Sequence, residues 1–106
     1  MPKYLIKATY TTEGIRGVMK EGGTARRAAV QKLVEGGGGK VEAFYFTYGE
    51  DDAIVIIDLP DASSALAVSV AVNASGAVRI STVPLITPEE MDTAVKQSVA
   101  YRAPGA

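Results

Sequence analysis

The sequence of 106 residues contains no cysteine and no histidine. The absence of cysteine excludes disulfides, thiolate zinc sites, cysteine-ligated iron–sulfur clusters and cysteine nucleophiles. The absence of histidine removes the usual general base, the usual haem ligand and the serine–histidine–aspartate triad. Acid–base catalysis would have to use aspartate, glutamate, tyrosine or lysine. We therefore expect no metal site and no cofactor.

The chain also lacks an excess of charge of either sign and a long apolar segment. Eleven lysines and arginines against twelve acidic residues give a net charge of -1, so no basic stripe is present to attract nucleic acid or anionic membrane. No segment approaches the roughly 20 apolar residues that a membrane helix needs, and the N-terminus has no signal-peptide pattern. We predict a cytoplasmic protein with no nucleic-acid or membrane partner.

What the chain does have is enough apolar material for one core. Hydrophobic residues make up 47% of the sequence and charged residues 22%, which is typical of a folded domain. A length of 106 residues is that of a single domain. We therefore expect residues 1–106 to form one domain, with an irregular tail from about residue 100.

Alternation of apolar and polar residues predicts four strands, and capping signals predict the helices between them. The expected strands are residues 3–11, 40–48, 52–59 and 77–83. The expected helices begin at the caps Thr24, Asp61 and Thr87, with a short helix or turns over residues 12–21. The order is β-α-β-β-α-β plus a C-terminal helix. This is an α+β, ferredoxin-like antiparallel sheet with helices on one face.

The same periodicities assign side chains to faces. Strict alternation puts Tyr4, Tyr10 and Tyr45 on one set of strand faces, and Phe44, Phe46 and Tyr48 on the other. On the helix that follows Asp61, helical spacing predicts one face made of Ala62, Ala65, Leu66, Ser69 and Val70.

The sheet face without helices is the most informative feature of the pattern. An uncovered face should alternate toward polar residues if it meets water. The run from Ile54 to Ile57 is instead apolar on both faces, and Leu5 lies opposite Ile6. Because a large contiguous apolar patch is rare on a soluble monomer, we predict a homo-oligomer formed through this open face. The alternative is that the C-terminal helix folds back over it.

Three stretches carry a resemblance to a known family: Gly38 to Phe46, Gly49 to Ile56, and Thr87 to Glu90. They resemble the GYD domain family, small proteins similar to the dimeric α+β barrel superfamily. Gly49 and Asp52 match the glycine and aspartate of the family's name, and Asp51 stands where the tyrosine would be. The resemblance implies the fold and an oligomer. The superfamily includes cofactor-independent monooxygenases, haem-using enzymes and ligand-binding regulators, so the fold does not fix the function.

Six residues form the candidate ligand-binding set: Tyr10, Arg16, Tyr45, Tyr48, Asp52 and Arg79. A tyrosine and an arginine that line an apolar cleft can orient an aromatic or acidic small molecule. The alternative is an ordinary core or interface, where tyrosine is common because it buries its ring and keeps its hydroxyl bonded.

Two further segments have a functional and an ordinary interpretation. The carboxylates of Glu50, Asp51 and Asp52 are either ligands for a hard cation or a solvated turn. Residues 20–27 combine glycines, a hydroxyl and two arginines, Arg26 and Arg27. They form either a cradle for a phosphate or carboxylate or the plain start of a helix.

These features favour an oligomeric domain that binds a small apolar or aromatic molecule between the sheet and the helices. The alternative is a cofactor-independent, monooxygenase-like enzyme that acts on small aromatic substrates.

Overall fold

The computed structural model describes residues 1–106 and contains one four-stranded antiparallel sheet. The strands are β1 (Lys3–Tyr10), β2 (Lys40–Phe46), β3 (Ala53–Asp58) and β4 (Val78–Leu85). The helices are α1 (Thr12–Glu21), α2 (Gly23–Gly36), α3 (Ala62–Ala74) and α4 (Pro88–Val95). The strand order β2-β3-β1-β4 confirms the predicted α+β, ferredoxin-like arrangement with an added C-terminal helix.

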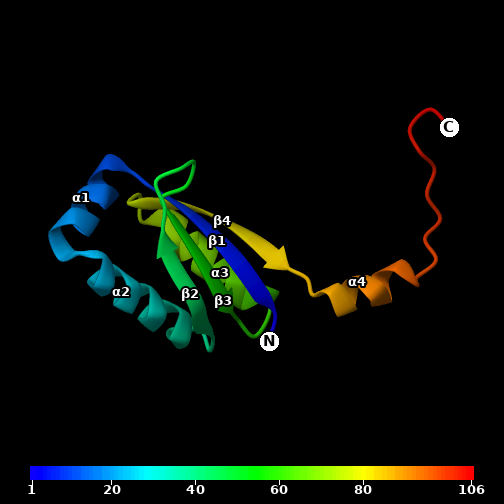
Figure 1. Ribbon diagram of the computed structural model, residues 1–106, viewed down its shortest axis with the longest axis horizontal. Coiled ribbons are helices and arrows are strands. Elements are labelled where there is room, and N and C mark those ends of the chain that lie inside the picture. The colour runs from blue at the N-terminus through cyan, green and yellow to red at the C-terminus, as the bar shows by residue number, and fades with distance from the viewer.

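Helices α2 and α3 pack against one face of the sheet, which we call the covered face (Figure 1). In β1 and β3 every second residue points toward these helices, and all of these residues except the half-buried Tyr10 are buried, as period-2 alternation predicts. The largest fully buried side chains are Ile57, Leu59 and Val34, which come from β3, the loop after it and α2. The hydrophobic core therefore lies between the sheet and the two helices.

The segment between β1 and β2 holds two helices, where we predicted a short helix or turns followed by one helix. Thr11 caps α1 by accepting a hydrogen bond from the Gly14 N–H at 3.2 Å. Gly22 then ends α1 and precedes α2 directly, with a φ of 88° that favours glycine. Thr24 therefore lies inside α2, and its predicted role as the cap is wrong.

The other two predicted caps are confirmed. The Asp61 carboxylate accepts from the Ser64 N–H at 2.9 Å at the start of α3. This bond holds the pKa of Asp61 below its usual value. Thr87 and Glu90 form a reciprocal capping box at α4, with Pro88 in the first turn.

A β-bulge in β2 overturns part of the predicted face assignment. Val41 pairs with Ile57 and Ala43 pairs with Ile56, so Glu42 is an extra residue without a partner in β3. The alternation changes phase at this point. Phe44 and Phe46 lie on the covered face, whereas Tyr45 lies on the open face with Ala43. Tyr45 is therefore on the opposite face from Tyr4 and Tyr10.

The buried side of α3 also differs from the prediction. Ala65, Val68, Ser69 and Val72 point toward the sheet or are half-buried against it. Leu66 and Val70 are exposed, with 65% and 58% of their surface accessible. Most residues of α3 are small or apolar, so hydrophobicity alone gives little information on which side faces inward.

The open face carries an apolar row that crosses all four strands. In register, this row is Ala43, Ile56, Leu5 and Val83, from β2 to β4. The row on one side contains Asp58 and Lys3, and the row on the other contains Tyr45, Ile54, Lys7 and Ser81. The open face thus has an apolar centre between two rows that contain charges.

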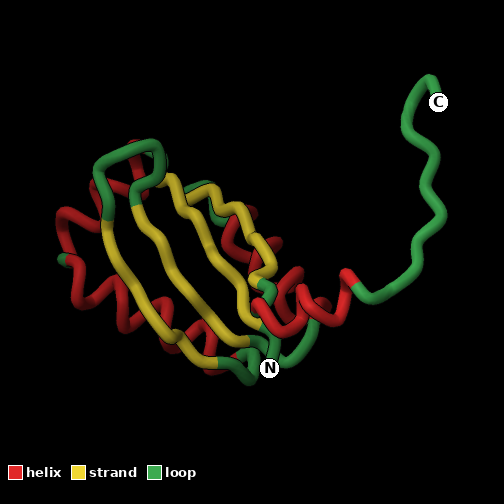
Figure 2. The backbone as a smooth tube through the Cα atoms, turned by 45° about the vertical axis from the view of Figure 1, so that its right-hand side comes forward, coloured by secondary structure: helices red, strands yellow, loops and turns green.

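The C-terminal helix does not cover the open face. Both α4 and the tail after it extend away from the sheet, beyond the end of β4 (Figure 2). This arm lengthens the molecule to 55 Å in one direction, against 33 and 23 Å in the others. The radius of gyration is 16.8 Å, compared with about 13 Å for a compact domain of this length. The predicted alternative of a helix folded over this face is therefore not adopted.

Candidate functional site

The candidate site is a cleft between α2 and α3, which we call the α2–α3 cleft. Helix α2 packs over β2 and helix α3 over β4, at opposite edges of the sheet, so the central strands are less covered (Figure 1). The cleft has a volume of about 470 Å³ and is closed at one end by α1. This volume lies within the range of roughly 300–1,000 Å³ that is typical of ligand pockets.

A narrower space of about 50 Å³ lies on the sheet side of the α2–α3 cleft, and we call it the apolar slot. Two small residues on the central strands, Ala8 and Ala53, pair in register and line this slot. Fourteen of the fifteen residues around the slot are hydrophobic, and Arg26 is the exception. The floor of the cleft therefore runs into the hydrophobic core.

Helix α1 forms the end wall of the cleft because it is held against the start of β4. The Thr11 N–H donates to the Ala77 carbonyl oxygen at 3.0 Å, and the Thr11 hydroxyl bonds to the same atom at 3.2 Å. A Cβ at Gly14 would lie 1.9 Å from that oxygen, so no other residue fits there. Gly14, Gly17 and Val18 line the cleft on this side.

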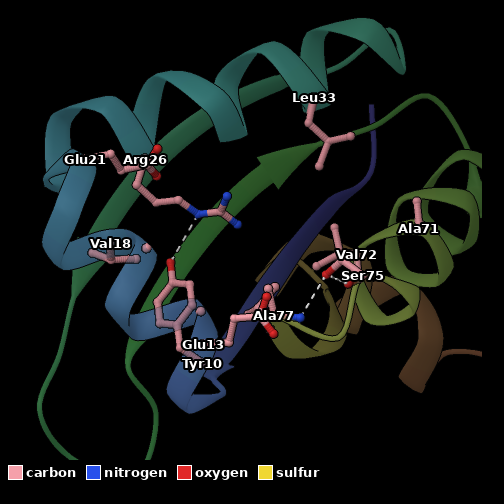
Figure 3. A pocket seen from close by; sticks show the side chains of 13 residues that line it. Tyr10, Glu13, Val18, Glu21, Arg26, Leu33, Ala71, Val72, Ser75 and Ala77 are labelled. Carbon is pink, nitrogen blue, oxygen red and sulfur yellow. Dashed lines mark hydrogen bonds between the residues drawn. The ribbon is translucent and has the colours of Figure 1, made fainter.

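Arg26 and Tyr10 form the polar end of the apolar slot. Arg26 Nε donates to the Tyr10 hydroxyl oxygen at 3.4 Å, and the guanidinium carbon lies 5.8 Å from the centre of the Tyr10 ring. Figure 3 shows the Arg26 side chain reaching from α2 toward the Tyr10 hydroxyl. Both side chains are half-buried and line both the α2–α3 cleft and the apolar slot.

Asp52 holds the backbone of Tyr10 in this position. The Tyr10 N–H donates to Asp52 Oδ2 at 2.8 Å, and the Asp52 N–H donates to the Ala8 carbonyl oxygen, also at 2.8 Å. These two bonds tie the β2–β3 hairpin to the end of β1. Of the six candidate residues, Tyr10 and Asp52 are thus brought together, but only Tyr10 lines the cleft.

The other four candidate residues lie elsewhere. Arg16 is exposed on α1 and is absent from the lining of the cleft. Tyr45 is 70% exposed on the open face, and Arg79 is exposed on the open-face side of β4, opposite Thr9. Tyr48 is fully exposed in the hairpin between β2 and β3. The predicted set therefore does not converge on one site.

Arg26 lines the cleft but does not belong to the predicted set of six residues. The sequence placed it among the glycines and arginines of residues 20–27, and its neighbour Arg27 carries the same charge. Arg26 lines the cleft, whereas Arg27 is exposed and faces a different hollow, beside Phe44 and Phe46. Helical geometry alone turns adjacent residues by about 100°, but it does not say which one points inward.

The hairpin carboxylates have structural partners. Asp51 forms an ion pair with Lys7, with 3.6 Å between Oδ2 and Nζ, and Asp52 accepts the bond from Tyr10. No group of three or more acidic side chains converges in a way that would hold a metal ion.

A second charged cluster lies at the other end of the open face. Lys3 Nζ is 2.5 Å from Glu42 Oε2 and 2.9 Å from Asp58 Oδ1. The hydrogen bond to Glu42, followed by the one to Asp58, raises the pKa of Lys3 above its usual value. The Asp58 side chain is buried, and its Oδ2 has no hydrogen-bond partner. This cluster lies on the face opposite the cleft.

A comparison with protein families finds a match to the GYD domain over residues 4–95. The matched range includes the four strands apart from Lys3, the cleft and α4. Comparisons with curated proteins and with solved structures gave no match. None of the helices combines the length and the apolar character needed to cross a membrane.

Proposed function

The chain belongs to the GYD domain family, and we propose that it binds a small apolar or aromatic molecule in the α2–α3 cleft. The observation that carries this proposal is the apolar slot, where fourteen of fifteen lining residues are hydrophobic. Burial of apolar ligand surface in such a site contributes about 25 cal/mol per Å². The few polar groups at the slot's end then orient the ligand.

A neutral aromatic probe, N-phenyl-1-naphthylamine, tests the binding site directly. We expect its fluorescence to rise on titration with the protein. The variant Ala71→Phe places a ring at the mouth of the cleft and should weaken probe binding about tenfold, which corresponds to about 1.4 kcal/mol. The matched control is Ala62→Phe, at the exposed start of α3 and outside the cleft. Absence of probe binding to the unmodified protein would refute the proposal.

The second part of the proposal is that the chain forms a homo-oligomer through its open face. The apolar row across the sheet has charged rows on both sides, and stable interfaces likewise have an apolar centre and a polar rim. A two-fold contact would bring the same row of two copies together.

Native mass spectrometry measures the oligomer and any retained ligand in one experiment. We expect a dimer or a multiple of a dimer at micromolar concentration. Ile56→Lys, in the centre of the apolar row, should give a monomer, and Val83→Lys at 38% exposure should act in the same direction. Leu66→Lys on the outer side of α3 is the control and should leave the assembly intact. A monomeric unmodified protein would contradict this part of the proposal.

We keep cofactor-independent oxygenation of small aromatic substrates as the alternative activity, and a cytoplasmic location as a prediction. An oxygen electrode with a panel of quinols and hydroxyaromatic compounds tests the first. Turnover that Ala71→Phe abolishes would place catalysis in the cleft, whereas no oxygen uptake with any compound would leave ligand binding as the function.

A further inference from the structure

The positive charge at the polar end of the cleft, on Arg26, forms no ion pair with another side chain. The ion pairs of the structure join Lys3 to Glu42 and Asp58, and Lys7 to Asp51. Arg26 takes part in none of them, and the neutral Tyr10 hydroxyl at 3.4 Å is its hydrogen-bond partner. A guanidinium has five N–H donors, so most of its hydrogen-bonding capacity is free.

The surroundings of Arg26 make this free charge unusual. Arg26 is half-buried and is the one non-hydrophobic residue that lines the apolar slot. A charge beside apolar side chains is costly unless it is paired, and a guanidinium pairs best with a planar carboxylate through two parallel hydrogen bonds. The Tyr10 ring lies within cation–π distance and holds the guanidinium at the end of the slot.

From this geometry we propose that the ligand of the α2–α3 cleft is a monocarboxylic acid with an apolar body. Its carboxylate pairs with Arg26, and its apolar body lies in the wider cleft against Leu33 and Val72, which also line the apolar slot. This inference rests on the proposed function, because it concerns the same cleft and adds the charge of the molecule that binds there.

Two glutamates limit the charge of the ligand. Glu13 and Glu21 line the wider part of the cleft but not the slot, and neither forms an ion pair with Arg26. Figure 3 shows both at the α1 end of the cleft. Their like charge disfavours a second anionic group outside the slot. A compound with one carboxylate therefore fits better than a phosphate ester or a dicarboxylate.

Two fluorescent probes of similar shape and different charge test this inference. 8-Anilino-1-naphthalenesulfonate is a monoanion, and N-phenyl-1-naphthylamine is its neutral counterpart without the sulfonate. We expect the anionic probe to bind the unmodified protein more tightly. Arg26→Gln should weaken binding of the anionic probe about tenfold to a hundredfold, which is the range for hydrogen bonds to charged groups. The affinity for the neutral probe should stay nearly unchanged.

Arg27→Gln is the matched control, because it removes the same charge from the next residue of α2 outside the cleft. It should change the affinity for neither probe. Displacement of the anionic probe by decanoate and by decanol then tests whether the cleft prefers a carboxylate to a hydroxyl on the same apolar chain. Decanoate should displace the anionic probe at lower concentration than decanol does, and this difference should disappear in Arg26→Gln. Circular dichroism of each variant confirms that it is folded.

The outcomes separate this inference from the proposed function. If both probes bind equally well and Arg26→Gln changes neither affinity, the cleft binds ligands, but the proposal of a carboxylic acid as the ligand is wrong. The same conclusion follows if Arg27→Gln has the effect of Arg26→Gln, because net charge alone would then explain the result. If neither probe binds the unmodified protein, the proposed function fails, and the acid ligand fails with it.

Discussion

The two faces of the sheet are made from alternate residues of the same four strands, but they differ in how they meet their surroundings. The covered face has small residues, Ala8 and Ala53, paired at one end of its central strands, and helices over its edges. The open face has larger apolar residues, Ile56 and Leu5, in the middle, with charges on both sides. A concave apolar surface results on one face and a flatter apolar row on the other. The first suits a small ligand, and the second suits another protein surface.

The largest expected difference between the faces is in stability. Ile57 and Ile56 are neighbours in β3, and their side chains point to the covered and the open face. Because Ile57 is only 1% exposed, Ile57→Ala should lower the free energy of unfolding by about 2–5 kcal/mol. Ile56→Ala should cost clearly less at low protein concentration. Urea denaturation at several protein concentrations measures both.

The concentration dependence sharpens this comparison. If the open face is an interface, the loss caused by Ile56→Ala should grow as the protein is concentrated, because the unmodified protein gains stability from association. The loss caused by Ile57→Ala should not grow in this way. Equal losses for the two variants at every concentration would mean that the faces are equally buried.

A smaller contrast concerns two adjacent aspartates of the hairpin. Asp52 accepts the Tyr10 N–H on the side of the cleft, so Asp52→Ala leaves that donor without its partner and should cost about 1–3 kcal/mol. Asp51 forms an ion pair with Lys7 in the open face, and Asp51→Ala should cost about 1 kcal/mol or less. Thermal melts give the order. The order would be reversed if the hairpin were held by its ion pair.

Only the first of these two variants should disturb the cleft. Asp52→Ala removes the bond that holds Tyr10 at the end of β1, and Tyr10 in turn orients Arg26. This variant should therefore also weaken binding of the anionic probe. Asp51→Ala should leave probe binding unchanged.

The smallest expected effect is the pH dependence of the charged row in the open face. The hydrogen bond to Glu42, followed by the one to Asp58, raises the folded-state pKa of Lys3 above its ordinary value of about 10.4. The stabilisation is therefore complete below about pH 10.4 and is lost as the pH rises through the folded-state pKa. The melting temperatures of the unmodified protein and Lys3→Met should differ most near neutral pH and converge in alkali. A constant difference would show that the ammonium charge does not matter.

The fold could be predicted from the sequence because its signals are local. Each of these signals involves residues only a few positions apart: the alternation in β1 and in β3, the Asp61 cap, and the Thr87–Glu90 capping box. The boundary between α1 and α2 was harder to predict, because two helices meet there at a single glycine, Gly22. Thr24 had the composition of a cap, but the chain had already turned into the helix one residue earlier.

The site could be predicted only in part, because it depends on long-range placement. Tyr10 was identified as one of the tyrosines that could line an apolar cleft, and it does line the cleft. Tyr45 and Arg79 lie on the face opposite the cleft, and the bulge at Glu42 was needed to place Tyr45 there. Arg26 and Arg27 have the same chemistry, and only the rotation of α2 over the sheet distinguishes them. No local signal reports that rotation.

The bulge in β2 also bears on how this strand can change in length. Deletion of Glu42 would leave Val41 and Ala43 adjacent, and Phe44 and Phe46 would still point to the covered face. Deletion of Tyr45 would instead exchange the faces of the residues on one side of it. The step between Val41 and Ala43 is therefore the place where homologous chains can gain or lose a single residue. Elsewhere in β2, we expect insertions and deletions to occur in pairs.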